Sequence, residues 1–140
     1  MAKSYVLDTS AIFTFTKSED GSDIVEDILV SAAKGRSYVY LSFISLMELY
    51  YVTWQAKSER AARELIILVK SLPVQRVDPN ERIILSAGRI KALHRLSVAD
   101  AFIAATAIEK SSILVHKDPE LQVVSAYAEM LELQYKRKKH

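Results

Sequence analysis

The sequence contains no cysteine, and it has only three glycines and three prolines in 140 residues. The absence of cysteine excludes disulfide scaffolds, thiolate zinc sites, iron–sulfur clusters and cysteine nucleophiles. Few glycines and prolines favour helices over a turn-rich all-β fold. Hydrophobic residues make up 50% of the chain and charged residues 26%, which is the composition of a folded protein rather than a disordered one.

Long apolar runs are also missing. The run from Leu65 to Val69 covers five residues, far short of the roughly 20 that a membrane-spanning helix needs. The first residues form no apolar signal core, because Asp8 interrupts them. We therefore expect a cytoplasmic protein.

The net charge of +2 is distributed unevenly. Residues 136–140 carry four Lys and Arg, whereas the rest of the chain carries 15 Lys and Arg against 17 Asp and Glu. A nucleic-acid-binding protein usually shows a broad basic face, so RNA binding by this chain would need bound cations or the tail. The expected organisation is one domain, 1–135, and a basic C-terminal tail, 136–140.

Short β-favouring runs alternate with helical periodicity along the chain. The predicted strands are Tyr5–Leu7, Tyr38–Leu41, Val74–Val77, Ile113–Val115 and Leu131–Tyr135. Apolar residues recur at helical spacing over 24–32, 43–54, 61–72, 83–93 and 97–108. This alternation predicts a three-layer α/β/α sandwich with a short, mainly parallel central sheet. Ligands bind such sheets beyond the carboxyl ends of the strands, where Asp8 and Asp118 are expected.

Four carboxylates stand among apolar or small residues, namely Asp8, Glu48, Asp100 and Asp118. Taken singly, each also fits a helix cap: Ser45 and Ser97 precede Glu48 and Asp100 at capping-box spacing, and a proline follows Asp118. Taken together, carboxylates that converge on one edge of the sheet repel one another by about 4 kcal/mol per close pair. A divalent cation would relieve this repulsion, and all-oxygen ligation suits Mg²⁺ or Mn²⁺. Water held by such ions can attack a phosphodiester.

Four segments resemble, in order, the motifs of PIN-domain nucleases: Val6–Ala11, Ser45–Leu49, Leu96–Ala101 and Ile113–Asp118. In length and motif spacing the chain is most similar to the VapC-type toxins of toxin–antitoxin pairs. The resemblance implies a Mg²⁺- or Mn²⁺-dependent endoribonuclease that hydrolyses structured RNA such as tRNA or rRNA. It implies that the catalytic and metal-binding acids are Asp8, Glu48, Asp100 and Asp118, and that Ser10 positions water or a carboxylate. It also implies a homodimer neutralised by a small cognate antitoxin.

His116 departs from this resemblance, because family members often have Thr or Ser two residues before the last acid. A strand-end histidine without a catalytic role is the simpler interpretation, and contact with substrate phosphate or water is the alternative. Glu120 could supplement the metal site or be a solvent-facing acid in the first turn of a helix. Two other functions fit the same chain: an rRNA-maturation PIN nuclease, and a non-catalytic PIN-fold module that binds RNA or protein.

Overall fold

Five parallel strands form the centre of the structure, which is a computed structural model that describes residues 2–134. The strands are β1 (Lys3–Leu7), β2 (Ser37–Ser42), β3 (Gln75–Val77), β4 (Ile113–His116) and β5 (Met130–Glu132). Their spatial order is β3-β2-β1-β4-β5, and Val6 of β1 is in register with Tyr40 of β2 and Leu114 of β4. All five predicted strands are present, although Tyr135, predicted to end the last one, lies outside the described residues.

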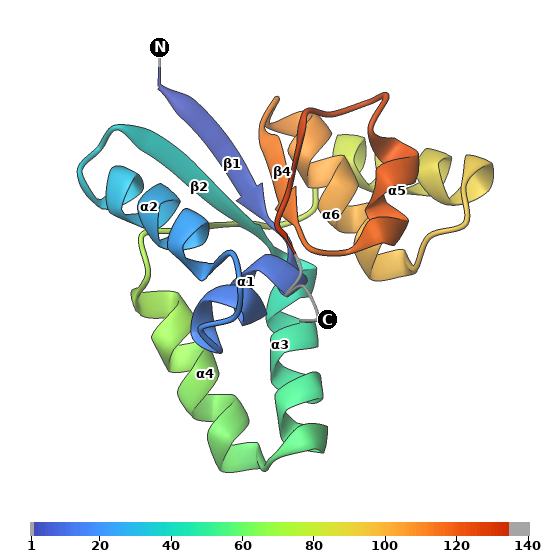
Figure 1. The fold of residues 1–140 in the computed structure, drawn as a ribbon. Coiled ribbons are helices and arrows are strands. Elements are labelled where there is room, and N and C mark those ends of the chain that lie inside the picture. The colour runs from blue at the N-terminus through green and yellow to red at the C-terminus, as the bar shows by residue number, and fades with distance from the viewer. Residues whose placement is uncertain (1, 135–140) are drawn as a thin grey trace, which may run out of the picture.

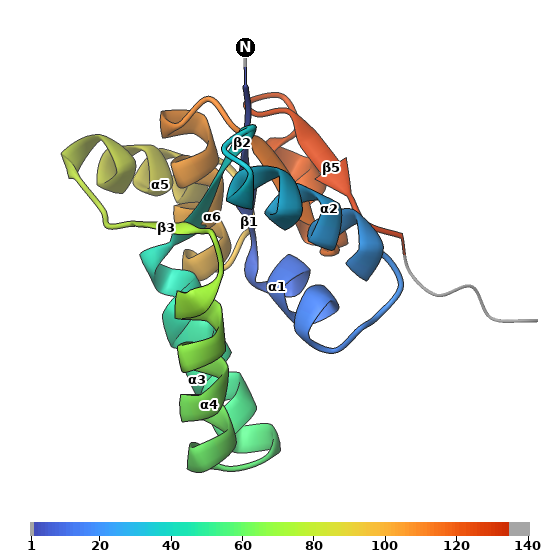
Figure 2. The same cartoon turned by 90° about the vertical axis from the view of Figure 1, so that its left-hand side faces the viewer.

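Helices connect the strands and cover both faces of the sheet. They are α1 (Thr9–Thr16), α2 (Ser22–Ala33), α3 (Phe43–Ala56), α4 (Glu59–Ser71), α5 (Glu81–Leu93), α6 (Val98–Glu109) and a 3-10 helix, η1 (Pro119–Val124). Figures 1 and 2 show α1 and α2 on one face of the sheet and α5 and α6 on the other, with α3 and α4 extending beyond the carboxyl ends of the strands. The predicted three-layer α/β/α sandwich is confirmed.

The alternation of side chains along the two central strands divides the core in two. Val6 and Leu114 pack with the α5–α6 side, whereas Leu7 and Val115 pack with the α1–α2 side, and all four are fully buried. On the first side, α6 presents fully buried small residues: Ala101, Ala104, Ala105 and Ala107. Small side chains allow a helix to lie close to its neighbours at the packing density of a protein interior. This packing fixes the first turn of α6 near the carboxyl edge of the sheet.

None of the helices within residues 2–134 is long and apolar enough to span a membrane. The tail predicted at 136–140 lies outside the described residues, and the division of the chain into a domain and a tail stays a prediction.

Candidate functional site

Asp8 lies between the end of β1 and the start of α1. Its backbone is extended, with φ −76° and ψ 174°, and its Oδ1 caps the helix by accepting from the Ala11 amide at 2.8 Å. Ser10 Oγ donates to the same oxygen at 2.6 Å. Because Asp8 is only 2% exposed, it is at once a helix cap and a buried carboxyl at the strand end.

Ser10 links two segments that are more than 100 residues apart. Its Oγ accepts from the backbone amide of Lys117 at 2.9 Å while it donates to Asp8. The backbone amide of Asp8 donates to the carbonyl of Val115 at 3.0 Å, so the two segments are also joined through the backbone. Ser10 therefore ties Asp8 to the segment that carries Asp118.

Glu48 is held by a hydroxyl that the sequence analysis did not identify. Thr9 Oγ1 lies 2.6 Å from Glu48 Oε1 and 3.1 Å from Ser45 Oγ, so one hydroxyl of α1 contacts two side chains of α3. The capping box predicted for Ser45 and Glu48 is wrong, because Ser42 caps α3 by accepting from the Ile44 amide. Ser45 lies within the first turn of the helix and faces Thr9 instead.

Asp100, Asp118 and Glu120 form the tightest group of acids. One carboxylate oxygen from each of the three lies within 4.8 Å of the other two. Ser97 caps α6 by accepting from the Asp100 amide at 3.1 Å, as its spacing predicts. Asp118 caps η1 with Oδ1, which accepts from the Glu120 amide at 3.0 Å. Glu120 thus lies in the group because η1 begins directly after Asp118.

The electrostatics of two carboxyls show that the acids act on one another. Burial raises the pKa of the Asp8 carboxyl from 3.8 to about 7, and the charges of Asp100 and Asp118 add to this while hydrogen bonds from Ser10 and Ala11 oppose it. Burial is also the largest cause that raises the pKa of Asp100 to about 7, followed by its interactions with Asp118 and the charge of Glu48. The four predicted acids therefore share one electrostatic environment at the carboxyl edge of the sheet.

The comparison with protein families matches residues 5–127 to the PIN domain. The chain belongs to the PIN domain family. The comparison with curated proteins finds no match.

Solved structures with similar folds share little sequence with this PIN domain. VapBC2 from Rickettsia felis, bound to a DNA fragment from its promoter, has a TM-score of 0.76 at 16% identity, over 94% of this chain and 99% of that chain. DNA-bound VapBC from Salmonella typhimurium has a TM-score of 0.73 at 20% identity, over 94% of this chain and 98% of that chain. VapC20 from Mycobacterium tuberculosis, a sarcin-ricin loop cleaving toxin, has a TM-score of 0.67 at 18% identity, over 86% of this chain and 94% of that chain. At these identities the similarity shows the fold.

The donor atoms of this PIN domain fit a divalent cation. Carboxylate oxygens suit Mg²⁺, Mn²⁺ or Ca²⁺ rather than zinc or copper. The ion pairs that Lys and Arg form within residues 2–134 engage acids elsewhere, at Glu19, Glu59, Glu64, Asp78 and Glu109. Protonation can relieve the repulsion among the site's acids at low pH, and a bound cation can relieve it once they are ionised.

His116 is the last residue of β4 and lies two residues before Asp118. It is fully buried, and its Nδ1 accepts from the backbone amide of Asp118 at 3.2 Å. Burial lowers the pKa of its imidazole from 6.5, against the charges of Glu132 and Asp118. At the position where family members often have Thr or Ser, this chain therefore has a neutral imidazole that is hydrogen-bonded to the backbone of Asp118.

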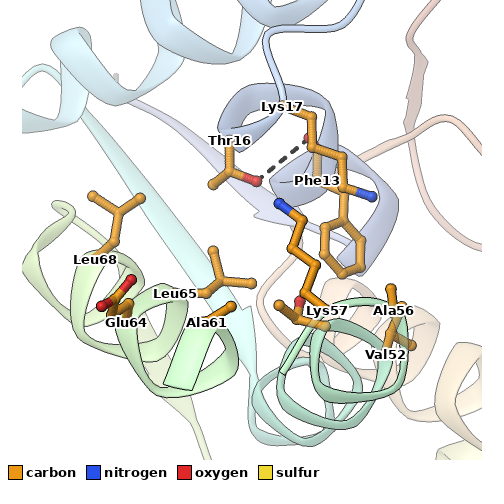
Figure 3. Close-up of a pocket in the computed structure, with 11 residues that line it drawn as sticks. Phe13, Thr16, Lys17, Val52, Ala56, Lys57, Ala61, Glu64, Leu65 and Leu68 are labelled. Atoms are coloured by element: carbon orange, nitrogen blue, oxygen red, sulfur yellow. Dashed lines mark hydrogen bonds between the residues drawn. The ribbon is translucent and has the colours of Figure 1, made fainter. Parts of the chain in front are cut away.

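A separate pocket of about 230 Å³ lies between α1, α3 and α4. Its apolar lining is Phe13, Val52, Ala56, Ala61, Leu65 and Leu68. Figure 3 shows the Lys57 side chain rising from α3 toward α1, and Lys17 Nζ lies 4.4 Å from the centre of the Phe13 ring. The lining comes from the later turns of α1 and α3 and from α4, and it includes none of the four predicted acids, so this pocket is distinct from the acidic site.

Proposed function

We propose that this PIN domain is a Mg²⁺- or Mn²⁺-dependent endoribonuclease and the toxin of a toxin–antitoxin pair. The observation that carries the proposal is the shared electrostatic environment of Asp8, Glu48, Asp100 and Asp118. Helix caps alone would not require carboxyls from four segments at one edge of the sheet. Mutually repelling acids destabilise a fold unless a cation or a proton offsets their negative charge. A reaction that requires a bound cation would explain why the four acids lie together.

Each acid has a proposed role. Asp100 and Asp118 would hold the principal cation together with Asp8, and Glu120 would supplement them. Glu48, fixed by Thr9, would bind a second ion or orient the attacking water by accepting its proton in a hydrogen bond. When bound, Mg²⁺ or Mn²⁺ lowers the pKa of water and offsets the charge that develops on the phosphate. Ser10 would keep Asp8 in place through the hydrogen bond that the two side chains share.

Structured RNA, such as tRNA or rRNA, is the proposed substrate. A protein of the same fold, VapC20, is described as a sarcin-ricin loop cleaving toxin, which supports an RNA substrate for this chain. An RNA substrate also supports a cytoplasmic location. The homodimer that the family resemblance implies stays a prediction, which sedimentation of the purified protein would test.

Incubation of the purified protein with total cellular RNA tests the proposed function. We expect discrete cuts in the presence of Mg²⁺ or Mn²⁺ and none in excess EDTA, with the fragment ends read by sequencing. Cleavage that persists in EDTA would contradict a cation-dependent mechanism. If the folded protein neither cuts RNA nor binds Mn²⁺ in calorimetry, the non-catalytic module becomes the better interpretation.

We further propose that a small antitoxin docks in the pocket between α1, α3 and α4. One solved structure with this fold is a toxin–antitoxin complex, and another belongs to the VapBC family of toxin–antitoxin systems. The pocket's apolar lining reaches the surface at Leu68, which is 45% exposed. Lys17, Lys57 and Glu64 are the charged lining residues, and Glu64 is paired with Arg60 at 3.2 Å. The surface therefore suits an amphipathic segment that carries apolar side chains beside an acid.

A substitution that fills this pocket is expected to release the antitoxin. Ala61→Trp places a large ring in the apolar lining, whereas Ala126→Trp introduces the same ring at an exposed position between η1 and β5. With the product of the neighbouring gene co-expressed, we expect at least tenfold less of it to co-purify with Ala61→Trp than with the control, since burial of a few apolar side chains is worth several kcal/mol. Equal recovery with both variants would place the docking surface elsewhere.

A further inference from the structure

Two side chains accept hydrogen bonds from the backbone amides that directly follow β4. Ser10 Oγ accepts from the Lys117 amide at 2.9 Å, and His116 Nδ1 accepts from the next amide, that of Asp118, at 3.2 Å. In the second bond the ring of one residue accepts from the amide two residues later. Asn and Asp side chains make the same connection in Asx turns. The histidine ring thus stabilises the turn that presents Asp118.

His116 is well placed for such a role because it is itself fixed. Its backbone belongs to β4, which lies between β1 and β5, and its carbonyl accepts from the Leu133 amide at 2.7 Å. The side chain is fully buried, so the ring cannot turn away into solvent. The Asp118 amide is therefore anchored to the central part of the sheet.

Packing alone does not account for a histidine at this position. A ring nitrogen that accepts a hydrogen bond from an amide carries no hydrogen of its own. The single N–H of the neutral ring is therefore at Nε2. Nε2 is buried and has no hydrogen-bond partner among residues 2–134. A buried N–H without an acceptor is unfavourable, and leucine would fill similar space without one. The hydrogen bond made by Nδ1 is what the histidine contributes.

We propose that His116 is a positioning residue, whose Nδ1 holds the Asp118 backbone so that the Asp118 carboxyl faces Asp100 and Glu120. The role deepens the proposed function, because it takes these carboxyls as the cation-binding group. Three contacts then fix Asp118: the ring accepts from its amide, its Oδ1 accepts from the Glu120 amide at 3.0 Å, and its carbonyl accepts from the Leu121 amide at 3.1 Å. Loss of the first contact would loosen the group without removing any of its carboxylates.

Two substitutions separate positioning from packing. His116→Asn keeps an acceptor near the place of Nδ1 but leaves a cavity, whereas His116→Leu fills the space and offers no acceptor. We expect His116→Leu to bind Mn²⁺ about tenfold more weakly than the wild type, the lower range for residues that orient metal ligands, and to keep its unfolding temperature. We expect His116→Asn to unfold at a lower temperature and to keep its Mn²⁺ affinity within about twofold. Calorimetry and thermal unfolding measure both quantities.

If His116 served only for packing, Mn²⁺ affinity would follow stability. His116→Asn would then bind Mn²⁺ more weakly than His116→Leu. Wild-type affinity in His116→Leu, or a loss in His116→Asn as large as in His116→Leu, would overturn the positioning role. Hydrogen exchange of the Asp118 amide in EDTA gives a test that uses neither metal nor RNA. Slow exchange is expected in the wild type and in His116→Asn, and fast exchange in the wild type would overturn the role. Failure of the wild type to cut RNA would contradict the proposed function and leave this result unaffected.

Discussion

Replacing Asp100 with asparagine is expected to abolish RNA cleavage while the protein stays folded. Both Asp118 and Glu48 raise the pKa of the Asp100 carboxyl, so Asp100 lies close to acids from two other segments. Asparagine keeps the size of the side chain but loses its charge, and an ion that offsets charge in the transition state is worth several kcal/mol. Each 1.36 kcal/mol is tenfold in rate, so we expect cleavage to fall by at least about a thousandfold.

Asp23→Asn is the matched control for this substitution. Asp23 lies in the first turn of α2 as Asp100 lies in the first turn of α6, but it is exposed. Both variants lose the same favourable interaction of an acid with a helix N-terminus. We expect Asp23→Asn to cleave RNA and bind Mn²⁺ like the wild type, whereas Asp100→Asn should unfold at an equal or higher temperature in EDTA because a like charge has been removed. Cleavage by Asp100→Asn at more than a few per cent of the wild-type rate would remove this acid from the mechanism.

The sequence predicted the parts of the fold that depend on local patterns. Buried strands were recognised because β-favouring runs such as Ile113–Val115 end abruptly at polar residues, and Asp8 and Asp118 were placed at the carboxyl edge by the geometry of parallel sheets. Capping was predicted correctly at Ser97 and wrongly at Ser45. The two serines have the same spacing to an acid, and only the residue at which each helix begins distinguishes them: α6 begins directly after Ser97, whereas α3 begins at Phe43, before Ser45.

Contacts between distant segments could not be predicted in this way. Thr9 meets Glu48 across 39 positions of the chain, and Ser10 meets the Lys117 amide across 107. No periodicity or motif encodes such pairs, because they depend on how α1, α3 and β4 pack in three dimensions. The bond from His116 spans only two residues, but its direction depends on the burial of the ring, which the sequence does not show.

Without metal, the protein is expected to become less stable as the pH rises from about 6 to about 8. The pKa of the Asp8 carboxyl is about 7 in the folded protein and near its ordinary value of 3.8 in the unfolded chain. The folded protein therefore binds more protons than the unfolded chain in this range, and its free energy of unfolding falls with rising pH. For one such carboxyl the loss between about pH 6 and about pH 8 is about 1.4 kcal/mol. The Asp100 carboxyl acts in the same direction, although its partial exposure reduces its share.

His116 opposes this trend at the lower end of the range, because its pKa is lowered in the folded protein and the unfolded chain therefore binds an extra proton near pH 6.5. One imidazole reduces the loss without reversing it, because the two carboxyls act together in the other direction. Urea unfolding at about pH 6 and about pH 8 in EDTA measures the loss, and Asp8→Asn should flatten it because one of the two carboxyls no longer ionises. Saturating Mn²⁺ should invert the dependence, since the cation binds the ionised carboxylates and stabilises the folded protein more as the pH rises. Stability in EDTA that rises between these two pH values would show that the acids ionise without strong mutual repulsion. A cation would then have little repulsion to relieve, and the electrostatic argument for the metal site would fail.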